Sequence, residues 1–211
     1  TAFGAVYAQP VAVADAGGRW DGLLRAYCSG SRTTPVWGVA ESAFHKAAHG
    51  KRLTEAETVV WAREKSRKAI LEALAQGRTY ARRRGDDYAL ALDAFSVSAE
   101  AGGGPESVAI SGETLKAPGP FTVHLRISAS DGVQRSVPVQ VIRAGSVIRE
   151  ETVTLPAELA VADAPPGDQI KTYYRLLIGG GGYRIVSNPV FVELVPAGGQ
   201  SEPPLAIGQG Q

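Results

Sequence analysis

The chain has 211 residues, of which 44% are hydrophobic and 20% are charged, so it can form one large domain or two small domains with buried cores. Its 22 Lys and Arg residues nearly balance its 21 Asp and Glu residues, which excludes the broad basic field that gathers nucleic acid or an anionic membrane surface. The single cysteine, Cys28, excludes an internal disulfide framework, and no apolar run reaches the roughly 20 residues that a membrane-spanning helix needs.

The beginning of the chain gives little information on its origin. Because the sequence contains no methionine, we expect Thr1 to begin a processed chain and not to be a translation start. No charged segment followed by an apolar stretch opens the chain, so it shows no export signal of its own. The sequence leaves the cellular compartment open, with a periplasmic or extracellular location favoured over a cytoplasmic one.

The first part of the chain alternates short apolar strands with helical segments. Residues 5–13 predict a buried strand, residues 19–27 an amphipathic helix, and residues 35–40 a strand that is apolar on both faces. A β-rich run at 58–62 precedes the clearest helical pattern, residues 66–76. This alternation predicts parallel strands joined by helical crossovers.

After Gly85 the pattern changes to short alternating runs separated by glycine and proline. Residues 121–129 alternate apolar and polar side chains without a break, which predicts a half-buried antiparallel strand. Similar runs predict further strands at 137–142, 147–155, 171–178, 183–186 and 190–195. Their number and spacing are typical of a β-sandwich.

Two sets of segments carry a resemblance to a known family. The first set is Asp21-Gly22-Leu23-Leu24, Val36-Trp37-Gly38-Val39-Ala40 with His45, Ala69-Ile70-Leu71-Glu72-Ala73-Leu74 and Gly77-Arg78-Thr79-Tyr80. The second set is Val141-Ile142-Arg143-Ala144-Gly145, Tyr173-Tyr174-Arg175-Leu176 and Ser187-Asn188-Pro189-Val190. In their order and spacing these segments resemble the C-terminal part of the PHP (polymerase and histidinol phosphatase) superfamily of metal-dependent phosphoesterases.

The resemblance implies a fold of α/β plus all-β class. Residues 1–86 would form the C-terminal portion of a PHP-like β/α barrel, and residues 87–196 an immunoglobulin-like antiparallel β-sandwich. Outside the resemblance, the composition of residues 197–211 predicts a disordered Gly/Pro/Gln tail. Because two or three strands cannot close a barrel, we expect residues 1–86 to be completed by an N-terminal barrel segment or a separate subunit.

The resemblance also implies a metal site that is incomplete in this chain. The last motif of the family is Asp-x-His, in which both residues bind metal, and here it reads Ala43-Phe44-His45. His45 would therefore be a ligand of a divalent ion (Zn, Mn or Fe) whose other ligands come from another segment. A methyl group cannot coordinate a metal, so Ala43 predicts an impaired site. Glu41, four residues before His45, is the carboxylate considered as a substitute.

Other polar residues have less specific interpretations. His49 follows His45 at helical spacing, but nothing nearby in sequence supplies the remaining ligands of a zinc site, and His124 is expected to be solvated. The basic cluster at the junction of the two regions comprises Arg78, Arg82, Arg83 and Arg84. It is interpreted either as a phosphate-binding site that includes Arg78 or as a solvated linker, and the net charge of +1 favours the linker. Covalent catalysis by Cys28 is not expected, because no histidine lies near it in sequence.

Two functions remain open at this point. One is the C-terminal portion of a PHP-like metal-dependent hydrolase, phosphoesterase-like, with an impaired metal site. The other is a non-catalytic scaffold, or a binding or assembly protein derived from that family, that acts through its β-sandwich. Ala43 favours the second function, because it stands where a metal-binding carboxylate is expected. The resemblance in fold does not decide between the two functions, since similarity of scaffold says little about chemistry.

Overall fold

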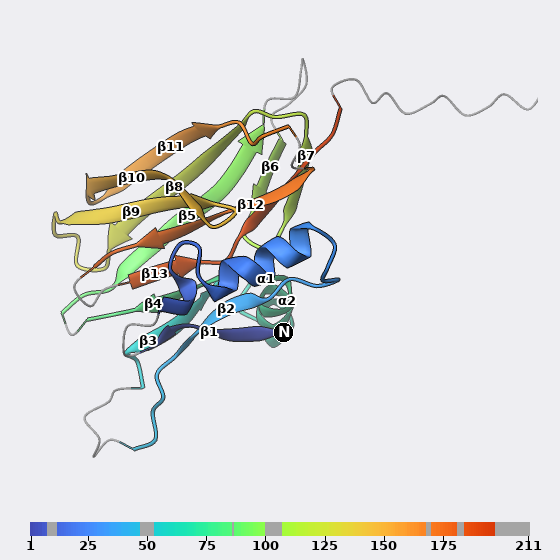
Figure 1. Cartoon of the computed structure of the whole chain (residues 1–211). Coiled ribbons are helices and arrows are strands. Elements are labelled where there is room, and N and C mark those ends of the chain that lie inside the picture. The colour runs from blue at the N-terminus through green and yellow to red at the C-terminus, as the bar shows by residue number, and fades with distance from the viewer. Residues whose placement is uncertain are drawn as a thin grey trace, which may run out of the picture.

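The computed structural model describes residues 1–7, 12–46, 53–85, 87–99, 107–167, 170–180 and 184–196. Figure 1 shows that most of this part of the chain is β-structure. Its two α-helices are α1 (Arg19–Cys28) and α2 (Arg67–Gln76), and a short 3-10 turn spans Ala12–Ala14. The first strands are β1 (Ala2–Tyr7), β2 (Trp37–Glu41), β3 (Ala56–Val60), β4 (Thr79–Arg83), β5 (Leu90–Ala99), β6 (Ser107–Ile110) and β7 (Thr114–Ala117). The later strands are β8 (Phe121–Ala129), β9 (Ser136–Arg143), β10 (Ser146–Thr154), β11 (Ala157–Asp163), β12 (Lys171–Ile178), β13 (Arg184–Ser187) and β14 (Val190–Leu194).

Two sheets form a sandwich that contains the larger hydrophobic core. One sheet has the strand order β10-β9-β12-β13-β4-β3, with β14 and β7 attached beside β12, and the other has the order β11-β8-β5-β6. Strand β8 lies antiparallel between β5 and β11, as its alternation predicts, and buries Phe121, Val123, Leu125 and Ile127. These side chains meet Tyr174, Leu176 and other residues of the larger sheet in one core.

The expectation of a β/α barrel over residues 1–86 is wrong for the described chain, whose sheets are open and whose fold is all-β in class. Strands β3 and β4 flank helix α2, but they pair antiparallel with each other and extend the larger sandwich sheet through β13. Hydrophobic periodicity cannot distinguish a helix that joins antiparallel neighbours from a parallel crossover, and this ambiguity produced the error.

The one parallel strand–helix–strand unit is β1–α1–β2, in which β1 and β2 form a separate two-stranded sheet. Figure 1 shows this unit against the outer side of the larger sandwich sheet, with α1 next to β12. A second core fills the junction and joins Ala5 and Trp20 of the unit to Ala81, Tyr173 and Phe191 of the sheet. Gly38 permits this contact, because a Cβ there would lie 2.8 Å from Ala5 and 3.1 Å from Trp20.

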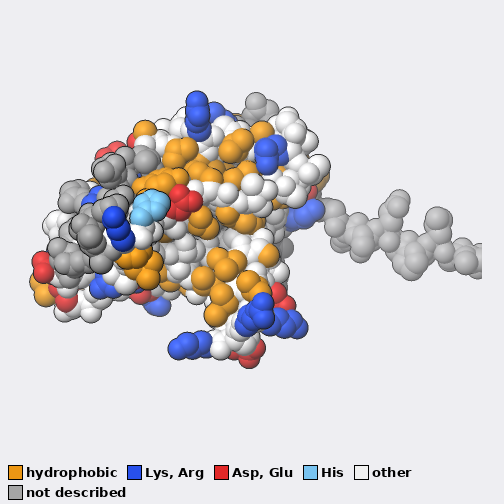
Figure 2. All heavy atoms as spheres, turned by 90° about the horizontal axis from the view of Figure 1, so that it is seen from below, with side chains coloured by type: hydrophobic (Ala, Val, Ile, Leu, Met, Phe, Trp, Pro, Cys, Tyr) orange, Lys and Arg blue, Asp and Glu red, His pale blue; other side chains and the backbone are white. Residues whose placement is uncertain are grey.

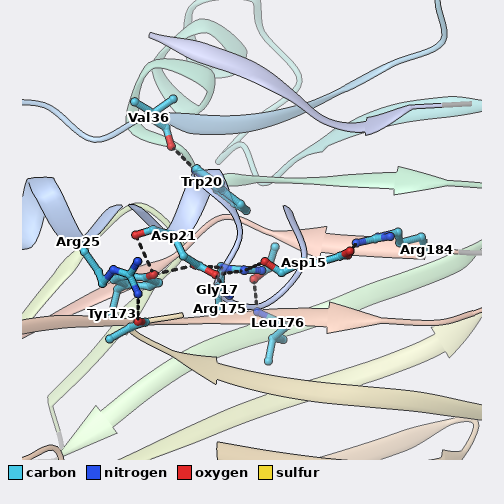
Figure 3. Close-up of polar contacts among 12 residues, drawn as sticks. Asp15, Gly17, Trp20, Asp21, Arg25, Val36, Tyr173, Arg175, Leu176 and Arg184 are labelled. Carbon is cyan, nitrogen blue, oxygen red and sulfur yellow. Dashed lines mark hydrogen bonds and ion pairs between the residues drawn. The ribbon is translucent and has the colours of Figure 1, made fainter. Parts of the chain in front are cut away.

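A fully buried ion pair fixes α1 on β12 (Figure 3). The Arg175 guanidinium donates from Nε and Nη2 to the two Asp21 oxygens at 2.7 and 2.6 Å. The Tyr173 hydroxyl donates to Asp21 Oδ1 at 2.7 Å, and the Gly17 amide donates to Oδ2 at 2.8 Å. Burial and the Asp21 carboxylate raise the pKa of the Tyr173 phenol well above its usual range. Every Asp21 oxygen is thus satisfied in a site without solvent exposure.

Asn188 makes the second polar connection between the unit and the sandwich. Its Oδ1 accepts from the Gly38 amide at 2.7 Å, and its Nδ2 donates to the Gly38 carbonyl at 3.1 Å. The same Nδ2 lies 2.7 Å from Thr79 Oγ1 and 3.2 Å from the Thr79 carbonyl. One buried side-chain amide therefore satisfies the backbone of β2 in place of a neighbouring strand.

Replacing Asp21 by Asn, which keeps the side-chain volume but removes the charge, should lower the free energy of unfolding by about 3–5 kcal/mol, because Arg175 is left buried without its counter-charge. Urea denaturation measures this loss. The control is Asp131→Asn, which alters the surface pair with Arg135 and should change stability far less. Similar small losses in both variants would contradict the role given to the buried pair.

Candidate functional site

The loop that follows β2 carries the residues expected to bind metal. Glu41 is the last residue of β2, and His45 lies four residues later on the protein surface, where both side chains are exposed. Glu41 lies beside Tyr7, and its hydrogen bond to the Tyr7 phenol raises the pKa of that group. The Glu41 carboxylate therefore already has a partner within the chain.

These residues do not by themselves fit a divalent metal ion. Within the described ranges, no three His, Cys, Asp or Glu side chains come close enough to one another to hold one. His49 lies outside the described residues. A structural or catalytic zinc site takes at least three protein ligands, so His45 and Glu41 would need ligands from another segment, as the sequence predicts.

Ala43 has an unusual backbone conformation for its residue type. Its φ angle of 49° places it in the left-handed region, which favours Gly, Asn and Asp and costs other residues about 1–2 kcal/mol. The backbone after β2 is thus better suited to Gly, Asn or Asp than to the alanine that is present.

The arginines near residue 80 form ion pairs with glutamates of the same chain. Arg78 pairs with Glu113 at 3.1 Å. Across the β3–β4 ladder, Arg82 and Arg84 pair with Glu57, at 2.6 and 3.4 Å, and Arg83 pairs with Glu55 at 3.3 Å. A phosphate would have to compete with these carboxylates. No hydrogen bond or ion pair in the described structure joins Arg78 to His45 or Glu41.

His124 and Cys28 lie in surroundings different from those of the loop after β2. His124 of β8 is hydrogen-bonded to Ser98 Oγ at 2.9 Å on the outer side of the smaller sheet, so it is not simply solvated. Cys28, the last residue of α1, is half-buried, and burial raises the pKa of its thiol to about 11. At neutral pH the thiol stays protonated and is a poor nucleophile.

The two edges of the β1–β2 sheet differ in a way that the sequence did not reveal. The outer edge of β2 is closed by side chains, because Asn188 bonds Gly38 and Thr58 Oγ1 accepts from the Ala40 amide at 3.0 Å. On the other strand, the Trp37 amide donates to the Thr1 carbonyl at 3.1 Å, so Ala2 and Gly4 direct their backbone groups away from β2. No described residue bonds these outward groups of β1.

Apolar side chains are exposed on the same side of the molecule. Figure 2 shows hydrophobic side chains gathered on the lower side, where β1, β2, β3 and α2 lie in Figure 1. Incompletely buried apolar residues of these elements include Val39, Val60 and Leu71, the last of which is 54% exposed. An open strand edge and exposed apolar residues are each typical of surfaces that another polypeptide covers.

No known protein family, curated protein or solved structure matches this chain. Neither described helix has the length and apolar character that crossing a lipid bilayer requires.

The Cys28 thiol should react with iodoacetamide at a rate that rises with pH up to about 11, because the rate follows the thiolate fraction and the pKa of the group is about 11. Mass spectrometry of samples quenched at a series of pH values measures this profile, with the urea-unfolded chain as control. A midpoint near 8.5, the ordinary value for cysteine, would contradict the burial of this thiol.

Proposed function

We propose that this chain is a non-catalytic assembly module, in which a β-sandwich holds the β1–α1–β2 unit so that a strand of another polypeptide segment can pair with β1. The single observation that carries the proposal is the contrast between the two edges of the β1–β2 sheet. One edge is closed by Asn188 and Thr58, and the outward groups of Ala2 and Gly4 have no described partner.

The isolation of the β1–β2 pair supports this proposal. Parallel strands occur almost only in larger sheets that are covered on both faces, and an isolated two-stranded sheet is marginal in water. Here one face packs on Ala81 of β4 and Val186 of β13 through the buried residues Ala5 and Val6. An added strand would extend the sheet and form main-chain hydrogen bonds with the outward groups of β1, which is how strand-addition complexes gain affinity.

The rigidity of the unit also supports docking. The Asp21–Arg175 pair, the Asn188 bonds and the hydrogen bond from Trp37 Nε1 to the Ala75 carbonyl at 3.0 Å attach the unit at three points. An edge that is held in place loses little conformational entropy when a partner binds, so more of the interaction free energy appears as affinity.

Replacing Ala2 by Pro should prevent strand addition without unfolding the chain, because it removes an outward amide from an edge strand, where proline is tolerated. Native mass spectrometry of the particle purified from its source should show a mass above the 22.1 kDa of this chain for the unmodified protein. The Ala2→Pro particle should have lost the added mass.

The matched control is Phe3→Pro, which removes an amide directed toward β2 and should lower the thermal stability of the chain itself. A native particle of the chain mass alone, with hydrogen exchange at Ala2 and Gly4 as fast as in an unstructured peptide, would overturn the assembly proposal.

The second candidate function is the one that the resemblance implies, a portion of a metal-dependent, phosphoesterase-like hydrolase with an impaired site. The observation that favours it is the left-handed conformation of Ala43 beside His45. Because the ligands in this chain are too few, such a hydrolase would depend on the partner segment for most of its metal site.

The variants Ala43→Asp and Ala43→Gly separate backbone strain from metal binding. Both should raise the free energy of unfolding by about 1 kcal/mol, because both residues accept a positive φ angle more readily than alanine. If the hydrolase interpretation holds, added Zn²⁺ or Mn²⁺ should further raise the melting temperature of the Ala43→Asp particle only. An identical response of both variants to the metals would remove the hydrolase candidate.

A further inference from the structure

A groove of about 400 Å³ lies where the end of α1 meets the beginning of β12, away from the β1 edge. Arg25, Cys28 and Ser29 line it from the helix side. Ala144, in the turn between β9 and β10, and the segment from Ile170 to Tyr173 complete its walls. Neither function proposed above uses this groove.

Two cations line the groove without an ion-pair partner among the described residues. Arg25 Nη1 donates to the Ala144 carbonyl over a long 3.4 Å. Lys171 Nζ lies 4.2 Å from the centroid of the Tyr27 ring and 5.7 Å from that of Phe191. These contacts orient the two side chains, and no described carboxylate forms an ion pair with either cation.

Two neighbouring carboxylates among the described residues are engaged by other cations. Asp21 is bound by Arg175 and Tyr173. Glu193, directly opposite Lys171 across the β12–β14 ladder, pairs with Lys116 at 3.2 Å. The C-terminal end of α1 contributes only about half a negative charge, which is less than the two full positive charges of the side chains. The described walls of the groove therefore carry a net positive charge.

The rest of the lining is mostly apolar or neutral. Ile170 is 71% exposed at the rim, and Ala144 and Thr172 add small neutral side chains. Burial raises the pKa of the Cys28 thiol to about 11, so this group is uncharged at neutral pH and does not repel an anion. The groove thus combines a cationic pair with apolar surface, which suits a ligand with one charged end.

We propose that this groove binds a small organic carboxylate with a short apolar body. The carboxylate lies between Arg25 and Lys171, and the body packs against Ile170 and Ala144. Arginine and lysine both bind carboxylates by charge-assisted hydrogen bonds, and an apolar body adds affinity as it leaves water.

Isothermal titration calorimetry of the full chain with hexanoate tests the proposal. Hexanoate should bind, acetate should bind more weakly, and the uncharged hexanamide should not bind. Arg25→Gln and Lys171→Gln should each weaken hexanoate binding by about fivefold to tenfold, which corresponds to the loss of one charge-assisted hydrogen bond. Arg19→Gln, at the opposite end of α1, is the control and should bind hexanoate normally.

A second measurement reports on the location of the site. Saturating hexanoate should slow alkylation of Cys28, since the thiol lines the groove, and should not slow it in the Arg25→Gln/Lys171→Gln double variant. Absence of hexanoate binding, equal binding of hexanamide, or hexanoate binding that is unchanged in the double variant would each overturn the proposal. Tight binding of inorganic phosphate with no gain from an apolar body would overturn the carboxylate assignment.

Discussion

The buried ion pair between Asp21 and Arg175 is the interaction on which the rest of the structure depends. It joins residues 154 positions apart and sets α1 directly on β12. Burying two charges is costly, so the pair is not a large net source of stability compared with an apolar contact. Its effect is positional, because any other placement of α1 would leave a guanidinium and a carboxylate buried without partners.

The edges of the sheets differ in how they are protected against pairing with a strand of another chain. At the edge of the larger sheet, β10 exposes Arg149 and Glu150, and charged side chains of this kind oppose pairing with another strand. The outer edge of β2 is closed by Asn188 and Thr58. The β1 edge has neither protection among the described residues, although it belongs to a rigidly held unit. This difference between the edges is the observation that supports the proposed assembly function.

Local sequence patterns predicted individual elements well. The helix at 66–76 is confirmed as α2, with Ser66 accepting from the Ala69 amide at its beginning and Gly77 in a left-handed conformation at its end. The alternation of residues 121–129 is confirmed as β8. The direction of strand pairing was not predictable. Strand β4 pairs with β13, which lies far away in the sequence, and contacts between distant segments leave no periodic signal.

The polar residues that organise the structure left weaker signals. Arg175 is a charge within the otherwise apolar stretch 173–178 of β12, and such a charge must find a buried partner. Asn188 is the only asparagine of the chain, and it follows directly after β13. In the sequence, both residues stand out only as members of segments that carry the resemblance. The identity of their partners, Asp21 and Gly38, depends on tertiary contacts across more than 140 positions and could not be read from either segment.

Native-state hydrogen exchange tests most directly the claim that the β1–α1–β2 unit and the sandwich form one cooperative body. The amide of Leu24 in α1 and the amide of Leu176 in β12 should exchange with the same free energy of opening, equal to that of global unfolding. Exchange at Leu24 through an opening several kcal/mol less costly than that of Leu176 would show that the unit detaches on its own, and would contradict the account.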